Sequence, residues 1–212
     1  MKLYSYFRSS AAYRVRIALA LKGIRYEYAA VHIGRGRQFD EAFLQINAQS
    51  LVPVLDDGFE RMTQSLAILE YLEETHPEPP LLPSDPHQRQ RVRSLALSIA
   101  CEIHPINNLR VLNHLTGTLG LDEAAKVAWY RHWVETGFRA LEQRLASDPA
   151  TGGFCHGDRP GYADVVLVPQ VANARRFQVD LTPYPTIVRI DAACQQLPAF
   201  REAAPAVQPD AE

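Results

Sequence analysis

The spacing of hydrophobic and polar positions changes several times near the N-terminus. Residues 2–7 (KLYSYF) alternate as a strand does, and residues 11–23 (AAYRVRIALALKG) follow a helical period that Gly23 is expected to close. Residues 24–33 (IRYEYAAVHI) are rich in the aromatic and branched side chains of strands. A strand, a helix and a strand in succession predict a parallel βαβ unit with a right-handed crossover.

The next part of the chain adds a second helix, a hairpin and a third helix. Residues 39–47 predict a short helix, and residues 52–63 predict a hairpin that turns at its DDG sequence. Residues 65–76 (SLAILEYLEETH) predict a strongly amphipathic helix. The expected order is therefore β-α-β-α-β-β-α.

A change in composition follows. Five prolines lie within residues 77–86 (PEPPLLPSDP), which is typical of a stiff linker between domains. We therefore expect an α/β domain over residues 1–77, a linker over 78–87 and an all-helical domain over 88–212.

The helical domain is expected to contain two long stretches and two shorter ones. The long stretches cover residues 87–117 and 121–147, and the shorter ones cover 163–177 and 185–197. Residues 203–212 (AAPAVQPDAE) are expected to form a loose tail.

Composition excludes several classes of function. The chain is 47% hydrophobic and 22% charged with a formal net charge of −2, it contains no basic run, and no apolar run is long enough to cross a membrane. The three cysteines are far apart without CxxC spacing, and no HExxH occurs. We expect a cytoplasmic protein with no metal site, and no nucleic-acid or membrane partner.

Two hydroxyls and a guanidinium meet at the start of the first predicted helix. Ser9 and Ser10 stand side by side, although a helix start commonly uses one polar cap. Arg8 precedes them on the loop after the first strand, at the carboxyl edge of the sheet where α/β folds bind ligands.

Two further dipeptides stand out in the α/β region. Pro53 opens a predicted strand, and a cis bond after Val52 would leave the backbone of Val52 open to a ligand. Ser65, after Gln64, is an acceptable helix cap on structural grounds alone.

The order of elements, with a proline opening the third strand, resembles the thioredoxin-like fold of the glutathione transferases. The double serine followed by RVRIALALKG from Arg14 resembles the signature of the zeta class, whose members include maleylacetoacetate and maleylpyruvate isomerases. QSLAILEYLEE from Gln64 and LVPQVANARRFQVDLTPYPTI at residues 167–187 are similar to that class too. The resemblance covers nearly the whole chain.

The resemblance implies that glutathione is a cofactor. Gln64 and Ser65 would bind its γ-glutamyl end, because a helix N-terminus offers free N–H groups to a carboxylate. Val52, next to Pro53, would pair with the cysteinyl unit through its backbone as a strand edge does.

Four more residues are candidate contacts to glutathione. Gln38 and Gln49 are candidates for its glycine end, although loop glutamines usually contact only water. His104 and Asn108 stand four apart in a predicted helix and would share a face. The alternative for this pair is local hydrogen bonding near a kink at Pro105.

Three arginines are candidate ligands for substrate carboxylates. Arg8 is a candidate because of its place at the carboxyl edge of the sheet. Arg176 matches an arginine that zeta-class isomerases associate with the substrate carboxylate, while Arg110 stands where that class usually has an uncharged residue. Arg176 could instead interact only with the dipole at a helix end, and Arg110 could be a solvated surface residue.

The resemblance implies cis–trans isomerisation through the thiolate of glutathione. A free thiol with a pKa of about 8.5 is only slightly ionised at pH 7, so the thiolate needs stabilisation by the protein. Ser9, or as second choice Ser10, would stabilise it by donating a hydrogen bond. Ala11 takes the place of a cysteine that the class often has, so that cysteine is not required here. The absence of this cysteine and the presence of Arg110 both depart from the commoner maleylacetoacetate type. They favour maleylpyruvate as the substrate, as in bacterial gentisate breakdown.

Other functions stay open. A transferase or dehalogenase that consumes glutathione on small halo acids would use the same arginines, and the fold can also persist as a binding module without catalysis. Family resemblance further implies a homodimer.

The sequence GDRPGYADV predicts a structural helix start. Gly161 stands at the cap position, where it offers no side-chain acceptor, and Asp164 can bond back to the N–H groups of the cap. We expect Asp164 to serve folding and not catalysis.

Overall fold

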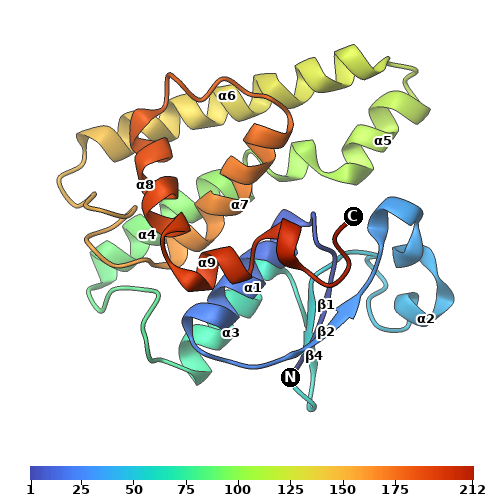
Figure 1. The fold of residues 1–212 in the computed structure, drawn as a ribbon, viewed down its shortest axis with the longest axis horizontal. Coiled ribbons are helices and arrows are strands. Elements are labelled where there is room, and N and C mark those ends of the chain that lie inside the picture. The colour runs from blue at the N-terminus through green and yellow to red at the C-terminus, as the bar shows by residue number, and fades with distance from the viewer. The chain divides into compact units, whose positions relative to one another are not determined.

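In the computed structural model, which describes residues 1–212, the N-terminal region forms the predicted β-α-β-α-β-β-α order. Short 3-10 turns at Ile33–Arg35 and Arg37–Phe39 precede the second helix. The elements are β1 (Lys2–Ser5), α1 (Ser10–Leu21), β2 (Glu27–Ala30), α2 (Glu41–Leu44), β3 (Val54–Asp56), β4 (Arg61–Thr63) and α3 (Ser65–Thr75) (Figure 1).

The four strands form one sheet in the order β2-β1-β3-β4. β1 and β2 are parallel, as predicted, whereas β3 is antiparallel to β1 and to β4. The register pairs Tyr4 with Val54 and Val54 with Thr63. The residues just after β1, just before β3 and just after β4 therefore lie at the same edge of the sheet.

Contacts divide the chain into two units. Unit 1 comprises Met1–Leu81 and Gln195–Glu212, and unit 2 comprises Leu82–Cys194. The division differs from the predicted boundaries at the C-terminus, because the last eighteen residues (195–212) cluster with the α/β part.

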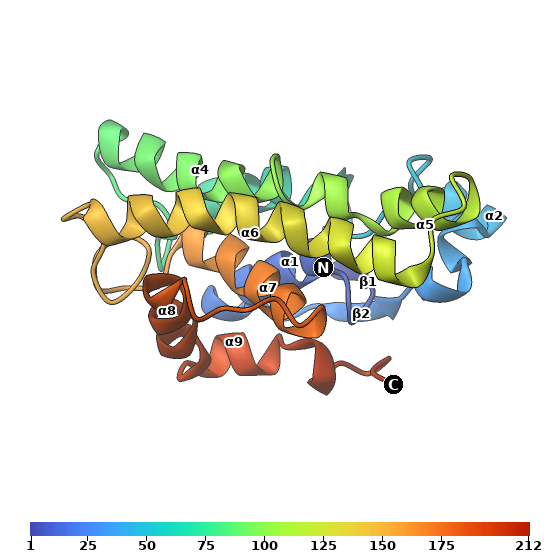
Figure 2. The same cartoon turned by 90° about the horizontal axis from the view of Figure 1, so that it is seen from above.

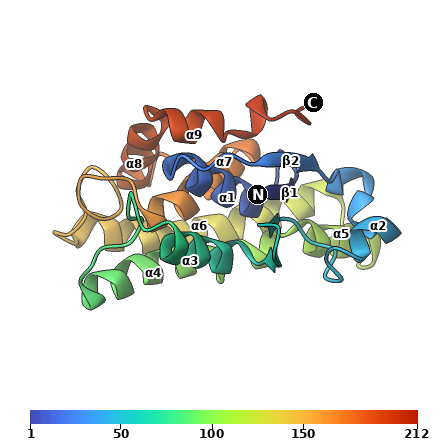
Figure 3. The ribbon, with the colours of Figure 1, turned by 90° about the horizontal axis from the view of Figure 1, so that it is seen from below.

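The C-terminal segment is ordered and not the predicted loose tail. It forms α9 (Pro198–Glu202), which packs on α1, and a 3-10 turn at Pro205–Val207 (Figure 3). Within the predicted tail (residues 203–212), the carbonyl of Ala203 accepts a hydrogen bond from Arg16 of α1 at 2.9 Å, and the carboxylate of Asp210 accepts from the N–H of Phe7 at 3.1 Å. The prediction was wrong because the composition of these residues does not reveal that α1 offers them partners.

Helix α1 is buried on most sides, since it contacts both α3 and α9. Such a helix is normally apolar all round, yet Arg14 and Arg16 are both buried. Gly23 follows the end of the helix with a φ of 66°, a left-handed conformation that suits the predicted glycine stop.

A buried ion pair fixes the far ends of α1 and α3. The ammonium of Lys22 lies 2.8 Å from the carboxylate of Glu73 and also donates to the carbonyls of His76 and Pro79. Glu73 in turn accepts from the N–H of Leu81. The first part of the proline-rich connection is thereby bound to unit 1.

Unit 2 is helical, as predicted. Its helices are α4 (Pro86–Ala100), α5 (Leu109–Gly117), α6 (Glu123–Ser147), α7 (Tyr162–Arg176) and α8 (Pro185–Gln195), the last of which ends at the unit boundary. Figure 2 shows α6, which has 25 residues, running beside α4. None of the helices combines the length and the hydrophobicity needed to cross a membrane.

The predicted long helix over residues 87–117 is wrong, because the chain breaks it into α4 and α5. Pro105 has no backbone N–H to continue the helix, and a 3-10 turn forms at Pro105–Asn107. Ile103 packs where a β-carbon on Gly137 of α6 would lie. The indole N–H of Trp129 donates to the carbonyl of Ile106 at 2.9 Å, so the broken segment is bound to α6.

Candidate active site

Ser9 caps α1. Its hydroxyl oxygen accepts a hydrogen bond from the N–H of Ala12 at 3.2 Å, and the side chain is half-buried. A hydroxyl that accepts in this way still has its own hydrogen to donate. Ser10, by contrast, is the first residue of the helix and is 7% exposed. Ser9 is therefore the more accessible of the two hydroxyls.

The N-terminus of α1 is open to an anion. No acidic residue lies in its first turn. The first N–H groups of a helix carry a partial positive charge, which favours a negative ligand. A thiolate next to Ser9 would receive both this field and a hydroxyl hydrogen bond.

Arg8 is exposed beside this helix start. Its guanidinium lies over the ring of Phe7, 4.7 Å from the centroid, and it forms no ion pair with a carboxylate of the chain. A stacked guanidinium keeps its fork of N–H donors for a planar carboxylate. Arg8 can thus bind an acid that comes from outside the chain.

The Val52–Pro53 peptide bond is cis. Val52 and Pro53 are both buried and lie just before β3, at the sheet edge where the β1–α1 loop begins. The backbone of Val52 makes no turn, loop or cap hydrogen bond. Its N–H and C=O are available to an extended peptide that pairs as an added strand.

Gln64 has a strained backbone at the start of α3. Its φ is 67° and its ψ is 109°, a conformation that non-glycine residues rarely adopt and that is often associated with functional sites. Its side chain does not cap the helix, and no acidic residue lies in the first turn of α3. This second open helix N-terminus lies at the same sheet edge, since Gln64 follows Thr63 of β4.

The structure brings several of the predicted glutathione contacts together. The side-chain N–H of Gln64 donates to the side-chain oxygen of Gln49 at 3.1 Å. Ser65 is 6% exposed, and its hydroxyl accepts from the guanidinium of Arg14 at 3.3 Å. Sequence reasoning missed Arg14, although an arginine among the apolar residues of a buried helix is a signal for such a role.

Gln38 differs from Gln49 in its surroundings. It lies in the 3-10 turn Arg37–Phe39, is 7% exposed, and its side-chain oxygen has no hydrogen-bond partner in the chain. Gln49 is exposed. A buried amide oxygen without a partner is costly, so Gln38 is a good candidate to bind water or a ligand.

His104 and Asn108 do not share a helix face, contrary to the prediction. His104 precedes the 3-10 turn, whereas Asn108 has an extended backbone and caps α5. The side-chain oxygen of Asn108 accepts from the N–H of Arg110 at 3.2 Å. The break at Pro105 removes the spacing argument, and for Asn108 local bonding is observed.

Two of the three candidate arginines belong to unit 2. Arg110 lies in the first turn of α5, is exposed and forms no ion pair. Arg176 is exposed at the last residue of α7, which is the predicted helix end, with its guanidinium over the ring of Phe177 at 4.8 Å. Phe177 stacks on Tyr130 at 3.6 Å.

Tyr130, which stacks on the Phe177 ring beneath Arg176, is uncharged at neutral pH. Burial raises the pKa of its phenol to about 12, although the nearby charge of Arg176 acts in the opposite direction. Tyr130 and Phe177 therefore supply an aromatic support for Arg176 without a negative charge that would compete for it.

Asp164 closes the N-terminus of α7 as predicted. One carboxylate oxygen accepts from the N–H of Gly161 at 2.9 Å and the other from the N–H of Cys155 at 2.8 Å. Burial raises the pKa of Asp164, and these backbone hydrogen bonds oppose the shift. With both oxygens in use, Asp164 has a structural role.

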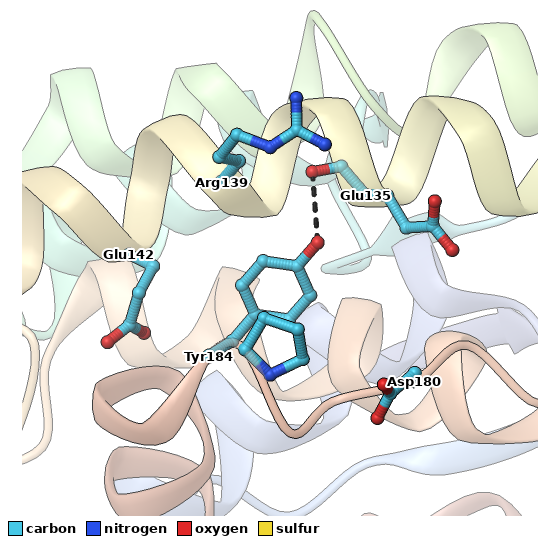
Figure 4. Close-up of a pocket in the computed structure, with 6 residues that line it drawn as sticks. Glu135, Arg139, Glu142, Asp180 and Tyr184 are labelled. Carbon is cyan, nitrogen blue, oxygen red and sulfur yellow. Dashed lines mark hydrogen bonds between the residues drawn. The ribbon is translucent and has the colours of Figure 1, made fainter.

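A cavity of about 330 Å³ in unit 2 contains none of the predicted site residues (Figure 4). Its lining residues are Glu135, Arg139, Glu142, Asp180, Pro183 and Tyr184. Three carboxylates against one guanidinium would repel an acidic substrate. Glu142 is also committed to the start of α8, where it accepts from the N–H groups of Thr186 and Ile187.

Comparison with known proteins identifies the family. Residues 1–74 match the family model for the glutathione S-transferase N-terminal domain, and residues 128–209 match that for the C-terminal domain. The chain belongs to the glutathione S-transferase family. The predicted fold class, a thioredoxin-like domain followed by an all-helical domain, is thus confirmed.

Individual relatives place it more narrowly within the glutathione S-transferases. The chain is 56% identical to maleylpyruvate isomerase from Ralstonia sp. over 99% of both chains. It also matches a holo structure of a maleylpyruvate isomerase described as a bacterial zeta-class glutathione S-transferase, with a TM-score of 0.99, 56% identity and full coverage of both chains. This match confirms the resemblance to the zeta class.

A further relative carries ligands. A crystal structure of maleylacetoacetate isomerase from Methylobacterium extorquens AM1, with bound malonate and glutathione, matches with a TM-score of 0.97, 43% identity and full coverage of both chains. That isomerase therefore holds a dicarboxylate, malonate, as well as glutathione.

Proposed function

We propose that the protein is a glutathione-dependent cis–trans isomerase of a maleyl keto diacid, with maleylpyruvate as the favoured substrate and fumarylpyruvate as the product. The observation that carries this function is 56% identity to maleylpyruvate isomerase over 99% of both chains. We further propose a cytoplasmic homodimer, in which residues 1–77 bind glutathione and the helical residues 88–212 contribute to substrate binding.

The residues of unit 1 fit glutathione. The open N-terminus of α3, with Gln64 and Ser65, suits the γ-glutamyl carboxylate because no acidic residue occupies its first turn. The unpaired backbone of Val52, next to cis Pro53, suits the cysteinyl unit. When bound, glutathione would supply a thiolate for reversible addition to the cis double bond.

Other residues are proposed as weaker contacts to glutathione. Gln38 and Gln49 are assigned to its glycine end, with the unpartnered amide oxygen of Gln38 in support. His104 and Asn108 keep a proposed role in cofactor binding, although their shared helix face is lost.

Ser9 is proposed to stabilise the thiolate. Its hydroxyl oxygen accepts from the N–H of Ala12, which leaves the hydroxyl hydrogen to donate to the thiolate, and the first turn of α1 adds the favourable field of a helix N-terminus. Ser10 is the second choice because it is buried in the helix. Lowering the pKa of the thiol by roughly two units corresponds to about 2.7 kcal/mol.

Arg8, Arg110 and Arg176 are proposed to bind the substrate carboxylates. All three are exposed. Fork-like guanidinium contacts with carboxylates are strong and directional. The same charges stabilise the enolate that develops beside the ketone when the double bond is attacked.

The decisive assay supplies maleylpyruvate or maleylacetoacetate to the purified protein with a small amount of glutathione. We expect many product molecules per glutathione, none without glutathione, and faster turnover of maleylpyruvate. The two substrates differ by one methylene, which a pocket discriminates by only about 1 to 3 kcal/mol. Stoichiometric loss of glutathione would instead identify a conjugating transferase.

A further inference from the structure

The loop between β1 and α1 is held by two charged side chains from other parts of unit 1. Arg16 donates from its guanidinium to the carbonyl of Phe7 at 3.1 Å, to the carbonyl of Tyr6 at 3.4 Å and to the hydroxyl of Ser5 at 3.1 Å. The carboxylate of Asp210 accepts from the N–H of Phe7 at 3.1 Å. The backbone N–H of Phe7 is thus bound by a negative side chain, Asp210, and its backbone C=O by a positive one, Arg16.

These bonds fix two successive peptide planes. The N–H of Phe7 belongs to the plane before this residue and its C=O to the plane after it, so neither plane can turn while both contacts persist. The next two residues along the chain are Arg8 and Ser9. The orientation of the loop that presents them is therefore set by Arg16 and Asp210.

The same contacts depend on the C-terminal segment. Arg16 also donates from its Nε to the carbonyl of Ala203 at 2.9 Å. The second oxygen of Asp210 accepts from the hydroxyl of Tyr28 on β2 at 2.6 Å. Both oxygens of Asp210 are used, and the last residues of the chain are bound to the strand beside β1.

The negative charge of Asp210 favours the charged form of Arg16. Arg16 is fully buried, and burial lowers the pKa of its guanidinium. Tyrosine hydroxyls and the carboxylate of Asp210 oppose that shift. Asp210 is therefore suited both to orient the loop and to favour the charged form of Arg16, which needs a counter-charge in the interior.

We propose that Asp210 is a positioning residue of the active site, which acts together with Arg16 to fix the backbone that carries Arg8 and Ser9. This rests on the proposed function, in which Arg8 binds a substrate carboxylate and Ser9 the thiolate. A misplacement of about 1 Å can reduce a rate roughly 100-fold even when it arises away from the reacting atoms.

Glu212 provides a matched control. It lies two residues further along the same segment and pairs with the side chains of His32 and Arg35, both exposed or half-buried. It makes no hydrogen bond with the backbone of the β1–α1 loop. Glu212→Gln removes one negative charge from the C-terminal segment without removing the contact to Phe7.

The test compares the full-length protein with Asp210→Ala, Asp210→Asn and Glu212→Gln. Three quantities are measured: the thermal midpoint, the pKa of glutathione bound to the protein from the ultraviolet absorbance of its thiolate, and kcat and KM with maleylpyruvate well below the midpoint. We expect Asp210→Ala to raise the thiol pKa and to lower kcat about tenfold or more. Asp210→Asn keeps an acceptor for the N–H of Phe7 and should show a smaller change in both.

An outcome in which Asp210→Ala lowers only the thermal midpoint, with thiol pKa and kcat equal to those of Glu212→Gln, would overturn the positioning role. If Asp210→Ala does not fold, the Asp210→Asn comparison decides in the same way. If the unmodified protein binds glutathione but isomerises neither diacid, the proposed function fails. The thiol pKa values of the variants still decide whether Asp210 positions Ser9.

Discussion

The N-terminus of α1 in unit 1 and the N-terminus of α7 in unit 2 solve the same chemical problem in opposite ways. At α7, both oxygens of Asp164 accept backbone N–H groups, so the chain itself supplies the anion. At α1, Ser9 caps one N–H and no acidic residue lies in the first turn. A helix start that the fold leaves without an anion is ready to bind one from solution.

The largest effect is expected on the free energy of unfolding, from a change at Asp164, which closes the N-terminus of α7. Asp164→Ala leaves the N–H groups of Gly161 and Cys155 without their acceptor, at about 1 to 3 kcal/mol each. We expect the free energy of unfolding, measured with urea, to fall by about 4 kcal/mol. Asp164→Asn keeps one acceptor and should lose less. Equal stability of all three proteins would show that α7 does not need its own anion.

A change at the open N-terminus of α1 should reduce activity more than stability. Ser9→Ala removes the proposed thiolate donor, and we expect kcat/KM for isomerisation to fall about 100-fold, equivalent to about 2.7 kcal/mol. Loss of the cap should cost only about 1 kcal/mol of unfolding free energy.

Ser9→Gly separates the two roles of this residue. Glycine is tolerated as a cap at a cost of a few tenths of a kcal/mol, but it also lacks the hydroxyl. Activity should therefore fall as far as in Ser9→Ala while stability is largely kept. Near-normal isomerisation by both variants, with a loss in Ser10→Ala, would transfer the role to Ser10.

A third change converts the open helix start toward the closed type. Ala11→Asp places a carboxylate in the first turn of α1, where it should stabilise the helix by about 0.5 kcal/mol. The same charge repels a thiolate, so we expect glutathione to bind about tenfold more weakly, or about 1.4 kcal/mol, by calorimetry. Ala11→Asn is the uncharged control. Unchanged affinity in Ala11→Asp would mean that the thiolate does not lie at this helix end.

The smallest effect is expected on the pH dependence of stability, from Asp57. This carboxylate resembles Asp164 in the hydrogen bonds it accepts but is less buried. Asp57 accepts from the N–H groups of Phe59 and Glu60 and from the hydroxyl of Tyr71. The Tyr71 hydroxyl, and then these N–H groups, lower the pKa of Asp57 from 3.8 to about 2. Asp164 accepts the same kind of bonds, yet burial raises its pKa.

The sign of the pH effect follows from the lowered pKa of Asp57. A carboxyl group with a lower pKa in the folded state stabilises the fold at pH values above 3.8, and this contribution disappears as the pH falls toward about 2. Asp57→Asn should therefore flatten the acid side of the stability curve in this window and change little at pH 7. Acid unfolding of the unsubstituted protein and of Asp57→Asn can be followed by circular dichroism. Parallel stability curves for the two proteins between pH 3.8 and about 2 would contradict this prediction.

Much of unit 1 could be predicted from sequence because its signals are local. Alternation, helical period, Gly23 and the DDG turn specify the order of strands and helices. The zeta-class motifs directed attention to Ser9 and Gln64, whose positions at one sheet edge follow from the strand register. Asp164 was predictable because its hydrogen bond to Gly161 spans only three residues.

The errors concern contacts between distant residues. Periodicity alone did not reveal that the chain breaks between α4 and α5, where Ile103 and Trp129 supply the compensating contacts. The contact between Asp210 and Phe7 spans 203 residues, and no local pattern encodes it. Arg16 gave the available hint, since a buried arginine in an apolar helix requires partners from elsewhere.

Unit 1 is built from two segments that are far apart in the sequence, and this has a consequence for folding during translation. Residues up to Leu81 are translated well before Gln195–Glu212. At about 5 to 20 residues per second, on the order of ten seconds separates the two segments. During that interval Arg16 lacks Ala203 and the N–H of Phe7 lacks Asp210. A nascent chain would therefore gain these contacts to the β1–α1 loop only after residues 195–212 have emerged, and a product that lacks those residues would carry the zeta-class motifs without this backbone support.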